Sequence, residues 1–332
     1  MGFSHLAPEM KSLTRRQARA RGLGCALPLL LALVPAWAAA PHGPTVMHCG
    51  SVPSAILGRS VGYCVALPAD YTTSGHRRYP VLYYLHGLFE NDRSWQENGG
   101  KAVLDHLLAK GEVGDFIVAL PDAGESFYVN SLSGKVRYED FFIREFIPFI
   151  DRTYRTIPSR GERALDGDSM GGYGSLHLGL SHANLFSVTC ALIPALIARL
   201  PNPFPEQFVH YEYVLEKSFG SPISETYWVA NSPLTLAKHP DNFKGLKIYF
   251  AAAESDRFGF EKGAEQLDEI LTAEHVPHVF TMRPGGHDWD FVDANMKGTL
   301  VFAWKYFKRA EAKDHAPHAA GPSRPNAELP GH

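Results

Sequence analysis

The chain has 332 residues, of which 45% are hydrophobic and 20% are charged, and its formal net charge is −3. These proportions are ordinary for a folded protein that buries a substantial core. The slightly negative balance argues against nucleic acid or an acidic membrane surface as the main partner.

The first 40 residues differ in kind from the rest of the chain. The basic stretch MKSLTRRQARARG is followed by the apolar run CALPLLLALVPAW and then by small residues. This order is typical of a secretory signal peptide, and the apolar run is too short to span a bilayer. We therefore expect residues 1–40 to be a signal peptide cleaved after Ala38. The mature protein would then be secreted or periplasmic, without a stable membrane anchor. The pair Arg15-Arg16 is a weak match to a twin-arginine export signal.

The four cysteines have different expected roles. Cys25 lies in the signal peptide, and Cys190 lies in an apolar run typical of a buried core. Cys49 and Cys64 flank a predicted hairpin and would meet an oxidising compartment. Their spacing does not fix the distance between their Cα atoms, so at this point a disulfide between them remains open.

Residues 41–312 are predicted to form one domain, because short apolar, β-rich runs alternate with segments of helical spacing. The expected strands are 79–87, 116–124, 163–169, 186–195, 246–256 and 278–287, and the expected helices are 99–111, 138–154, 262–275 and 296–310. This alternation predicts an α/β fold with a doubly wound, mostly parallel sheet. Residues 49–68 are predicted to add an antiparallel hairpin at one edge of that sheet.

Two segments depart from this alternation. Residues 197–243 are aromatic and rich in proline, and they fall between two predicted core strands. We expect this insertion to lie over the strand ends, where an α/β sheet binds ligands. Residues 313–332 are rich in Pro, Ala and His without an apolar period, which predicts a disordered tail.

A glycine-rich turn marks the first candidate for chemistry. Gly167, Ser169 and Gly171 form the pattern Gly-x-Ser-x-Gly between a predicted strand and a predicted helix. This pattern at a strand-to-helix turn is the nucleophile elbow of α/β-hydrolases, in which glycines leave room for a sharply bent serine. The motif occurs by chance often enough that it needs partners elsewhere in the chain.

Suitable partners follow the serine in the chain. A serine hydroxyl needs a base to remove its proton and a third group to orient that base. Asp256 ends the predicted strand after the insertion, and His287 follows the next strand. Order and position at strand ends both fit a Ser–acid–His triad. The alternative interpretation of Asp256 is a helix N-cap, which would leave Glu254 as the acid.

Other roles are open to this histidine. His287 could be a loop residue, or a metal ligand beside Asp288 and Asp290, but no second histidine stands at ligand spacing. We therefore predict no metal site.

Backbone N–H groups must also stabilise the developing oxyanion. Those of Met170, after the serine, and Leu88, after a predicted strand, are the expected donors.

Two polar residues near this site have other expected roles. His86 precedes the elbow in the chain, so a structural hydrogen bond is favoured over a role as the base. The charge of Asp168 would oppose oxyanion formation if it faced the site. We therefore expect Asp168 to point away, into a surface or loop contact.

Four stretches together carry a resemblance to a known family. They are YYLHGL, PDAGESFYVN, GDSMGGYGSL and PGGHDWDF, and the similarity runs from about residue 48 to residue 308. The chain resembles the putative-esterase family, which contains esterase D, feruloyl and tributyrin esterases and, more distantly, the mycobacterial antigen 85 mycolyltransferases. This resemblance implies an α/β-hydrolase fold and no cofactor. The chain departs from the family at Asp166 and Asp168, where less polar residues are common.

The resemblance implies roles for five residues of this sequence. It places the catalytic triad on Ser169, Asp256 and His287, and the oxyanion donors on Leu88 and Met170.

These observations together predict a secreted serine esterase that hydrolyses carboxylic esters through an acyl-enzyme. The alternatives are an acyltransferase of the mycolyltransferase type and, in another class, a hydrolase fold that binds without catalysis. The expected substrate is a small-molecule or carbohydrate-linked ester with a short acyl or cinnamoyl-type group. The aromatic side chains expected to line its cleft are Trp95, Phe127, Tyr128, Trp228 and Trp289.

Overall fold

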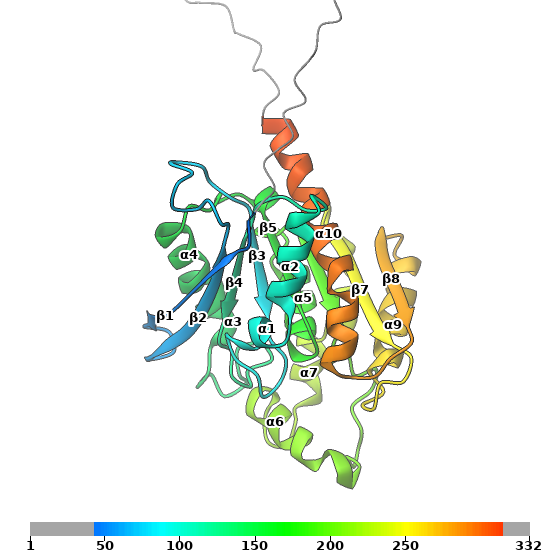
Figure 1. Ribbon diagram of the computed structural model, residues 1–332. Helices are drawn as coiled ribbons and strands as arrows, with labels where there is room; N and C mark the ends of the chain where they lie inside the picture. The colour runs from blue at the N-terminus through cyan, green and yellow to red at the C-terminus, as the bar shows by residue number, and fades with distance from the viewer. Residues whose placement is uncertain (1–42, 315–332) are drawn as a thin grey trace, which may run out of the picture. The chain divides into compact units, whose positions relative to one another are not determined.

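The computed structural model describes residues 43–314 of the chain (Figure 1). The expected signal peptide and residues 315–332 of the expected tail lie outside the described residues. Eight strands form a single sheet: β1 (Val46–Ser54), β2 (Arg59–Leu67), β3 (Val81–Leu85), β4 (Ile117–Pro121), β5 (Arg163–Gly167), β6 (Val188–Leu192), β7 (Lys247–Ala253) and β8 (His278–Arg283).

The order of the strands in the sheet is β1-β2-β4-β3-β5-β6-β7-β8. The six strands from β4 to β8 in this order run parallel. β1 and β2 pair antiparallel with each other, and β2 pairs antiparallel with β4. The predicted mostly parallel sheet with an antiparallel hairpin at its edge is therefore confirmed. Because parallel strands end at a common edge, the loops after β3, β5, β7 and β8 meet there.

Helices cover both faces of the sheet (Figure 1). One layer is made of α1 (Ser94–Glu97), α2 (Gly100–Ala109) and α10 (Trp289–Asp314), and the other contains α3 (Tyr138–Phe141), α4 (Ile147–Thr153), α5 (Met170–Ser181) and α9 (Phe260–Ala273). Strand β3 shows how the two cores are separated. Val81, Tyr83 and Leu85 pack into the core on the α5 side. Leu82 and Tyr84 pack into the core on the α10 side. A strand buried on both faces has this all-apolar composition.

The helix predicted over 138–154 is interrupted. A π-helical turn, Phe142–Phe146, separates α3 from α4. Pro148 stands at the start of α4 and has no N–H with which to reach the carbonyl four residues earlier. The π-helical turn accommodates this missing bond, because it widens the helix by one residue.

The insertion contributes α6 (Val209–Phe219), α7 (Glu225–Asn231) and α8 (Pro233–Leu236). Figure 1 shows α6 beyond the carboxyl ends of the strands, as expected from the sequence. The insertion is attached to α5 by two hydrogen bonds to one carbonyl group. Tyr173 Oη and His177 Nδ1 donate to the oxygen of Asn231 at 2.8 and 2.9 Å. This anchor sits directly behind the elbow, on the helix that follows Ser169.

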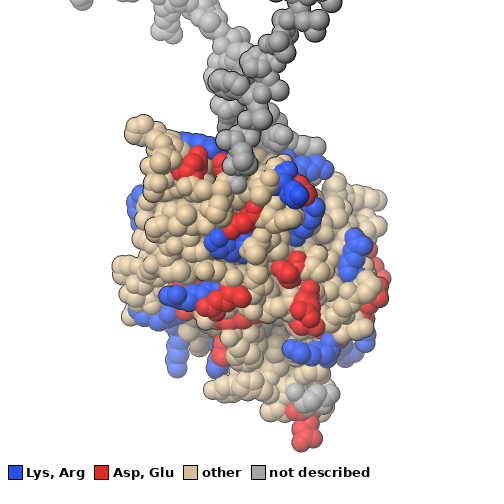
Figure 2. Space-filling model, in the orientation of Figure 1, with Lys and Arg blue, Asp and Glu red and all other residues tan. Residues whose placement is uncertain are grey.

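Two global features bear on the class of partner. On the face drawn in Figure 2, positive and negative side chains are interspersed. Between residues 43 and 314, none of the helices has both the length and the apolar character required to cross a membrane.

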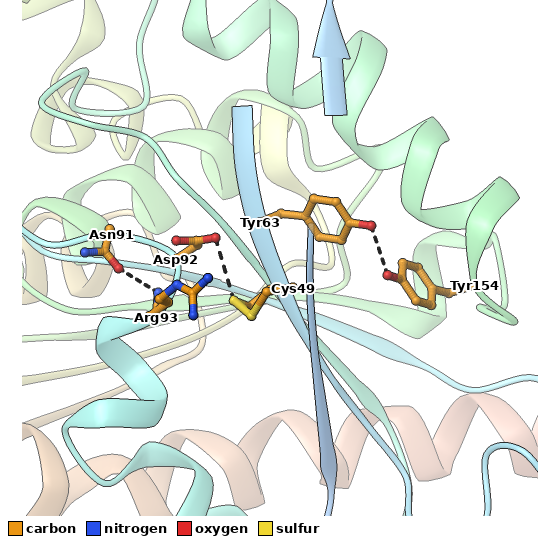
Figure 3. Close-up of a disulfide and its surroundings, with 7 residues drawn as sticks. Cys49, Tyr63, Asn91, Asp92, Arg93 and Tyr154 are labelled. Carbon is orange, nitrogen blue, oxygen red and sulfur yellow. Dashed lines mark hydrogen bonds between the residues drawn. A yellow bond between two sulfur atoms is a disulfide. The ribbon is translucent and has the colours of Figure 1, made fainter. Parts of the chain in front are cut away.

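The edge hairpin is closed by a disulfide. Cys49 and Cys64 stand directly opposite each other in the β1–β2 register, and the structure joins them. Beside the bridge, the hydroxyl groups of Tyr63 and Tyr154 are hydrogen-bonded at 3.0 Å (Figure 3). This contact ties the hairpin to the end of α4. Cys190 is a free, buried thiol, as its apolar surroundings predicted.

We expect the disulfide to stabilise the fold without taking part in chemistry. The bridged residues are 15 apart in sequence, and closing such a loop is worth about 3 kcal/mol in the chain-entropy model. Replacing both cysteines by alanine should lower the free energy of unfolding by about that amount, measured by denaturant titration. Loss of ester hydrolysis on mild reduction, well below the unfolding temperature, would contradict a purely structural role.

Candidate active site

The elbow places Ser169 at a sharp bend between β5 and α5. Its backbone has φ = 50° and ψ = −115°, a conformation that residues with a side chain rarely adopt. The bend brings the chain so close to β3 that a Cβ on Gly171 would lie 1.8 Å from the carbonyl oxygen of Leu85. Only glycine fits there. The Ser169 N–H donates to Leu192 O at 3.0 Å, so the bend is also held from β6.

The structure brings Ser169, His287 and Asp256 into one hydrogen-bonded line. The Oγ of Ser169 lies 2.8 Å from His287 Nε2, and His287 Nδ1 lies 2.7 Å from Asp256 Oδ2. Because a carboxylate only accepts hydrogen bonds, the ring donates its Nδ1–H to Asp256. Nε2 is then free to accept the Ser169 proton. This is the arrangement of a nucleophile, a general base and a group that orients the base.

The acid is held by its own loop as well as by the histidine. Asp256 Oδ1 accepts the N–H of Phe258 at 2.8 Å, and its side chain is buried. Helix α9 begins later and has Gly259 as its N-cap, so Asp256 does not cap it. Glu254, the alternative acid, is exposed. The geometry therefore assigns the acid position to Asp256.

The two expected oxyanion donors come from segments next to the serine. Met170 is the first residue of α5, so its N–H has no acceptor within the helix. Leu88 lies in the loop after β3 and lines the cavity at Ser169. The peptide group between Gly87 and Leu88 is fixed by His86, whose Nδ1–H donates to Gly87 O at 2.7 Å. In a trans peptide the N–H points opposite to the carbonyl, so this bond sets the direction of the Leu88 N–H.

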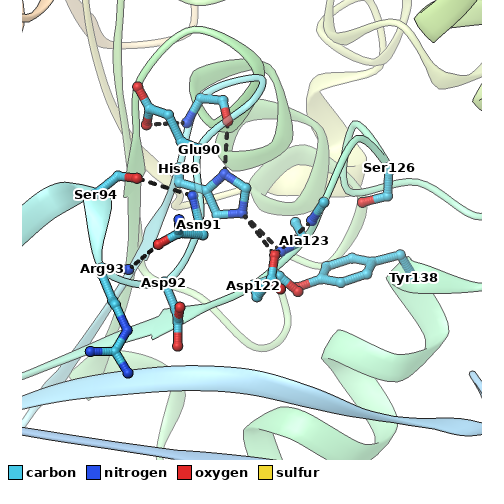
Figure 4. Close-up of polar contacts among 12 residues, drawn as sticks. His86, Glu90, Asn91, Asp92, Arg93, Ser94, Asp122, Ala123, Ser126 and Tyr138 are labelled. Atoms are coloured by element: carbon cyan, nitrogen blue, oxygen red, sulfur yellow. Dashed lines mark hydrogen bonds and ion pairs between the residues drawn. The ribbon is translucent and has the colours of Figure 1, made fainter.

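The rest of the His86 ring is also satisfied (Figure 4). Its Nε2 accepts the N–H of Ala123 at 2.8 Å, and the side chain is only 3% exposed. The carbonyl of His86 accepts the hydroxyl of Tyr128 at 3.0 Å. His86 therefore serves as the structural hydrogen-bonder that the sequence favoured. It connects the loop after β3 to the loop after β4.

A cavity of about 480 Å³ opens over Ser169. One wall consists of aromatic rings from the insertion, from the loop before α9 and from the first residue of α9: Phe208, Tyr211, Phe258 and Phe260. Phe258 and Phe260 also meet the His287 ring edge to face, with centroids 4.9 and 5.3 Å apart. The same four rings border a smaller apolar hollow of about 90 Å³ behind them. The size of the cavity is that of an ordinary small-molecule site.

Of the five aromatic residues expected to line the cleft, only Trp289 does so. Trp95, Phe127, Tyr128 and Trp228 are between 0 and 4% exposed and lie in the core. Trp228 packs against Phe219 and Tyr173 under the insertion. Tyr128 holds the His86 carbonyl instead of facing the cavity. The expectation was wrong for these four residues because their rings are buried in the core, where they pack against other side chains.

The expectation that Asp168 points away from the site into a surface or loop contact was wrong for the surface, although its Oδ2 lies against Gly87 in the loop after β3. Its side chain does not reach a surface contact, because the residue is only 3% exposed and borders the cavity. The hydroxyl of Tyr84 donates to its Oδ1 at 2.9 Å. Burial, together with the nearby charge of Glu90, raises the pKa of this carboxyl group well above its usual value.

Several pocket residues were missed by the sequence analysis. Phe258 and Phe260 follow Asp256 so closely that their proximity to the triad could have suggested a role. Glu90 and His210 carried no comparable signal, because their place at the cavity depends on loops that meet only in the fold. Asp288, a candidate metal ligand in the sequence, accepts the N–H of Phe291 and so caps α10. No group of three or more His, Cys, Asp and Glu side chains within residues 43–314 is arranged to hold a metal ion.

Comparison with known proteins decides the family. Residues 54–310 match the family model described as "Putative esterase". The chain belongs to this esterase family. Its relatives include an esterase of Mycobacterium tuberculosis, 27% identical over 250 residues, which cover 70% of this chain and 53% of the relative. An acetyl esterase of Caldicellulosiruptor saccharolyticus is 31% identical over 220 residues, or 64% of this chain and 78% of the relative. The chain thus spans about half the length of the mycobacterial relative.

Solved structures show the same fold. A ferulic acid esterase superposes with a TM-score of 0.69 at 27% identity, over 80% of this chain and 99% of that one. An S-formylglutathione hydrolase from Staphylococcus aureus superposes with a TM-score of 0.64 at 19% identity, over 78% and 98% of the two chains. The esterase family member described here therefore has the α/β-hydrolase fold predicted from its sequence.

We expect Ser169→Ala and His287→Ala each to lower kcat for ester hydrolysis by about 10⁴- to 10⁶-fold. The double variant should be little worse than either single variant, because the two side chains act as one unit. Steady-state kinetics on a p-nitrophenyl ester measure this, and circular dichroism checks that each variant is folded. Losses that add up in the double variant would show that the residues do not share one mechanism.

The acid assignment has its own test. Asp256→Asn should lower kcat by about 10⁴-fold, because the amide favours the wrong tautomer of His287. Glu254→Gln is the matched control, since Glu254 is exposed and two residues away. A larger loss in the control than in Asp256→Asn would transfer the role of the acid to Glu254.

Proposed function

We propose that this protein is an exported serine esterase that hydrolyses carboxylic esters through an acyl-enzyme. The observation that carries the proposal is the line from Asp256 through His287 to Ser169, which ends at a strained elbow inside an open cavity. Membership of the esterase family supports the same reaction class.

The proposed reaction has two steps. Ser169 Oγ attacks the ester carbonyl carbon while His287 Nε2 takes the serine proton, and the Leu88 and Met170 N–H groups stabilise the oxyanion. The alcohol leaves with the proton returned by His287, so that the acyl group stays on Ser169. Water then attacks the acyl-enzyme, again with His287 as base, and the carboxylic acid is released. Asp256 accepts the Nδ1–H of the imidazolium that forms in each step.

A fluorophosphonate probe tests the nucleophile directly. The probe should label the folded protein at Ser169, and Ser169→Ala should not be labelled. Absence of labelling would favour a hydrolase fold that only binds. If labelling occurs but acyl groups pass to added sugar or lipid alcohols faster than to water, the protein is an acyltransferase.

The shape of the cavity favours short acyl chains or flat aryl acids. Its wall is made of aromatic rings, and the adjoining hollow is small and does not offer a long channel for a lipid chain. The names of an acetyl esterase relative and a ferulic acid esterase neighbour point in the same direction. We therefore propose acetyl-to-butyryl or cinnamoyl-type esters, including carbohydrate-linked ones, as substrates.

The proposal that the protein is exported rests on two observations. The amino-terminal sequence has the order of a signal peptide, and a disulfide closes the edge hairpin. Structural disulfides are typical of secreted and periplasmic proteins. Fractionation of cells that express the full chain would test this, and retention in the cytoplasm would contradict it.

The aromatic wall gives a prediction about selectivity. Phe208→Ala should lower kcat/KM for a cinnamoyl-type ester by about 10-fold or more relative to an acetyl ester, because ring contact is lost. The neighbouring Val209→Ala is the control, since Val209 is exposed and outside the cavity wall. A kcat/KM maximum at palmitoyl chain length in the unmodified enzyme would contradict the proposed substrate class.

A further inference from the structure

Asp168 and Glu90 form a pair of acidic side chains beside the proposed oxyanion hole, and the role inferred for them rests on the proposed esterase function. Asp168 directly precedes the nucleophile, and Glu90 lies two residues after Leu88. Both border the cavity over Ser169. The triad mechanism uses neither of them, so their presence needs a separate explanation.

Glu90 links two parts of the site. Its Oε2 accepts the N–H of Gly87 at 3.0 Å, which holds the loop that carries Leu88. Its Oε1 accepts the Nε1–H of Trp289 at 2.7 Å, at the start of α10 and two residues beyond His287. Both carboxyl oxygens of Glu90 are therefore occupied as acceptors of N–H groups. Glu90 therefore links the loop after β3, which carries Leu88, to the loop after β8, which carries His287.

Asp168 lies against the same point of the backbone as Glu90. A Cβ built on Gly87 would be 2.7 Å from Asp168 Oδ2 and 3.4 Å from Glu90 Oε1. Glycine at position 87 thus leaves room for both carboxyl groups on one side of the loop. Like charges brought this close cannot both persist without cost in a buried site.

The two acids are not equivalent. Asp168 is only 3% exposed and receives one hydroxyl donor, from Tyr84. Among the ion pairs of residues 43–314, none includes Asp168. Burial first, and then the charge of Glu90, raises the pKa of Asp168 well above its usual value. Of the pair, Asp168 is the member that holds the proton.

Further charged groups face Asp168 from the neighbouring elements. Besides Tyr84 on β3 and Glu90 on the oxyanion loop, the titratable neighbours are Asp166 on β5 and, around the cavity, His287, Asp288 and Arg257. Asp166 is itself buried, and burial raises its pKa to about 7. It therefore adds negative charge next to Asp168 only as the pH rises past neutrality.

We propose that Asp168 works as a neutral carboxylic acid and that Asp168 and Glu90 together act as a positioning pair for the oxyanion hole. The pair carries one proton and one negative charge. That single charge accepts the Gly87 and Trp289 N–H groups and so holds the Leu88 loop against the His287 loop. A second charge at Asp168 would oppose the negative oxyanion that forms next to it. Activity is then present below the pKa of Asp168 and lost as the pH rises through it.

The first experiment compares kcat against pH for the whole enzyme, Asp168→Asn and Asp166→Asn. Asparagine keeps the shape of a neutral Asp168 but cannot ionise. We expect the unmodified enzyme to lose about 10-fold or more in kcat at alkaline pH. Asp166→Asn should keep this fall, and Asp168→Asn should lose it. An unchanged alkaline fall in Asp168→Asn would overturn the proposal.

The protonation state can be observed without turnover. The infrared spectrum at neutral pH should show a carbonyl band of a protonated carboxyl group that is missing in Asp168→Asn. Absence of any difference band would mean that Asp168 is ionised, which overturns the proposal. This readout does not depend on ester hydrolysis, so it separates failure of this proposal from failure of the proposed function, which fluorophosphonate labelling of Ser169 tests.

The second experiment tests the positioning role of Glu90. Glu90→Gln removes the charge and turns one acceptor into a donor that faces an N–H. We expect kcat to fall by about 10-fold or more while KM stays within about two-fold, because the loss affects the oxyanion and not the ground state. Trp289→Phe, which removes only the Nε1–H, should lose less. Equal kcat in Glu90→Gln and in the unmodified enzyme would overturn the positioning role.

Discussion

The strained bend at Ser169 is the constraint on which the rest of the site depends. A serine with positive φ is stable only where neighbours hold its backbone, and here Leu192 and Ala195 bond to its N–H and carbonyl groups. The bend also requires Gly171 to lie against β3. As a result the serine hydroxyl, the first amide of α5 and the loop after β3 are brought to one point. The catalytic geometry therefore follows from packing between the central strands.

Several carboxyl groups lie at this same edge of the sheet, and their surroundings differ. Asp256 accepts hydrogen bonds from a histidine ring and from a backbone N–H group. Asp168 is buried next to the charge of Glu90, and both favour its neutral form, whereas its one hydroxyl donor, from Tyr84, opposes this. Burial favours the neutral form of a carboxyl group, and each N–H or O–H donor that it receives opposes this effect. In the mechanism proposed above, a neutral Asp168 lets the site contain several acids without opposing the oxyanion.

The insertion separates specificity from chemistry. Helix α6 and the segment before it supply Phe208 and Tyr211 to the cavity wall, whereas the reacting groups come from the loops after the strands. The insertion is fastened to α5 through the Asn231 carbonyl, close behind the nucleophile. A change in this segment can therefore alter which acyl group fits while the triad stays in place. Such independence is common where one fold serves many substrates.

The sequence by itself determined the strands, the elbow and the three residues of the Ser169–His287–Asp256 line, because each rests on local pattern or chain order. Gly171 was required by a turn that can be read locally, and the carboxyl ends of parallel strands necessarily meet. Tertiary structure alone decided which aromatic rings face the cavity. Trp228 and Phe208 both lie in the insertion, but only packing against α5 buries the former. Tertiary structure also decided the Cys49–Cys64 disulfide, which depends on strand register, and the pairing of Asp168 with Glu90, which depends on contacts between distant loops. Neither leaves a local pattern in the sequence.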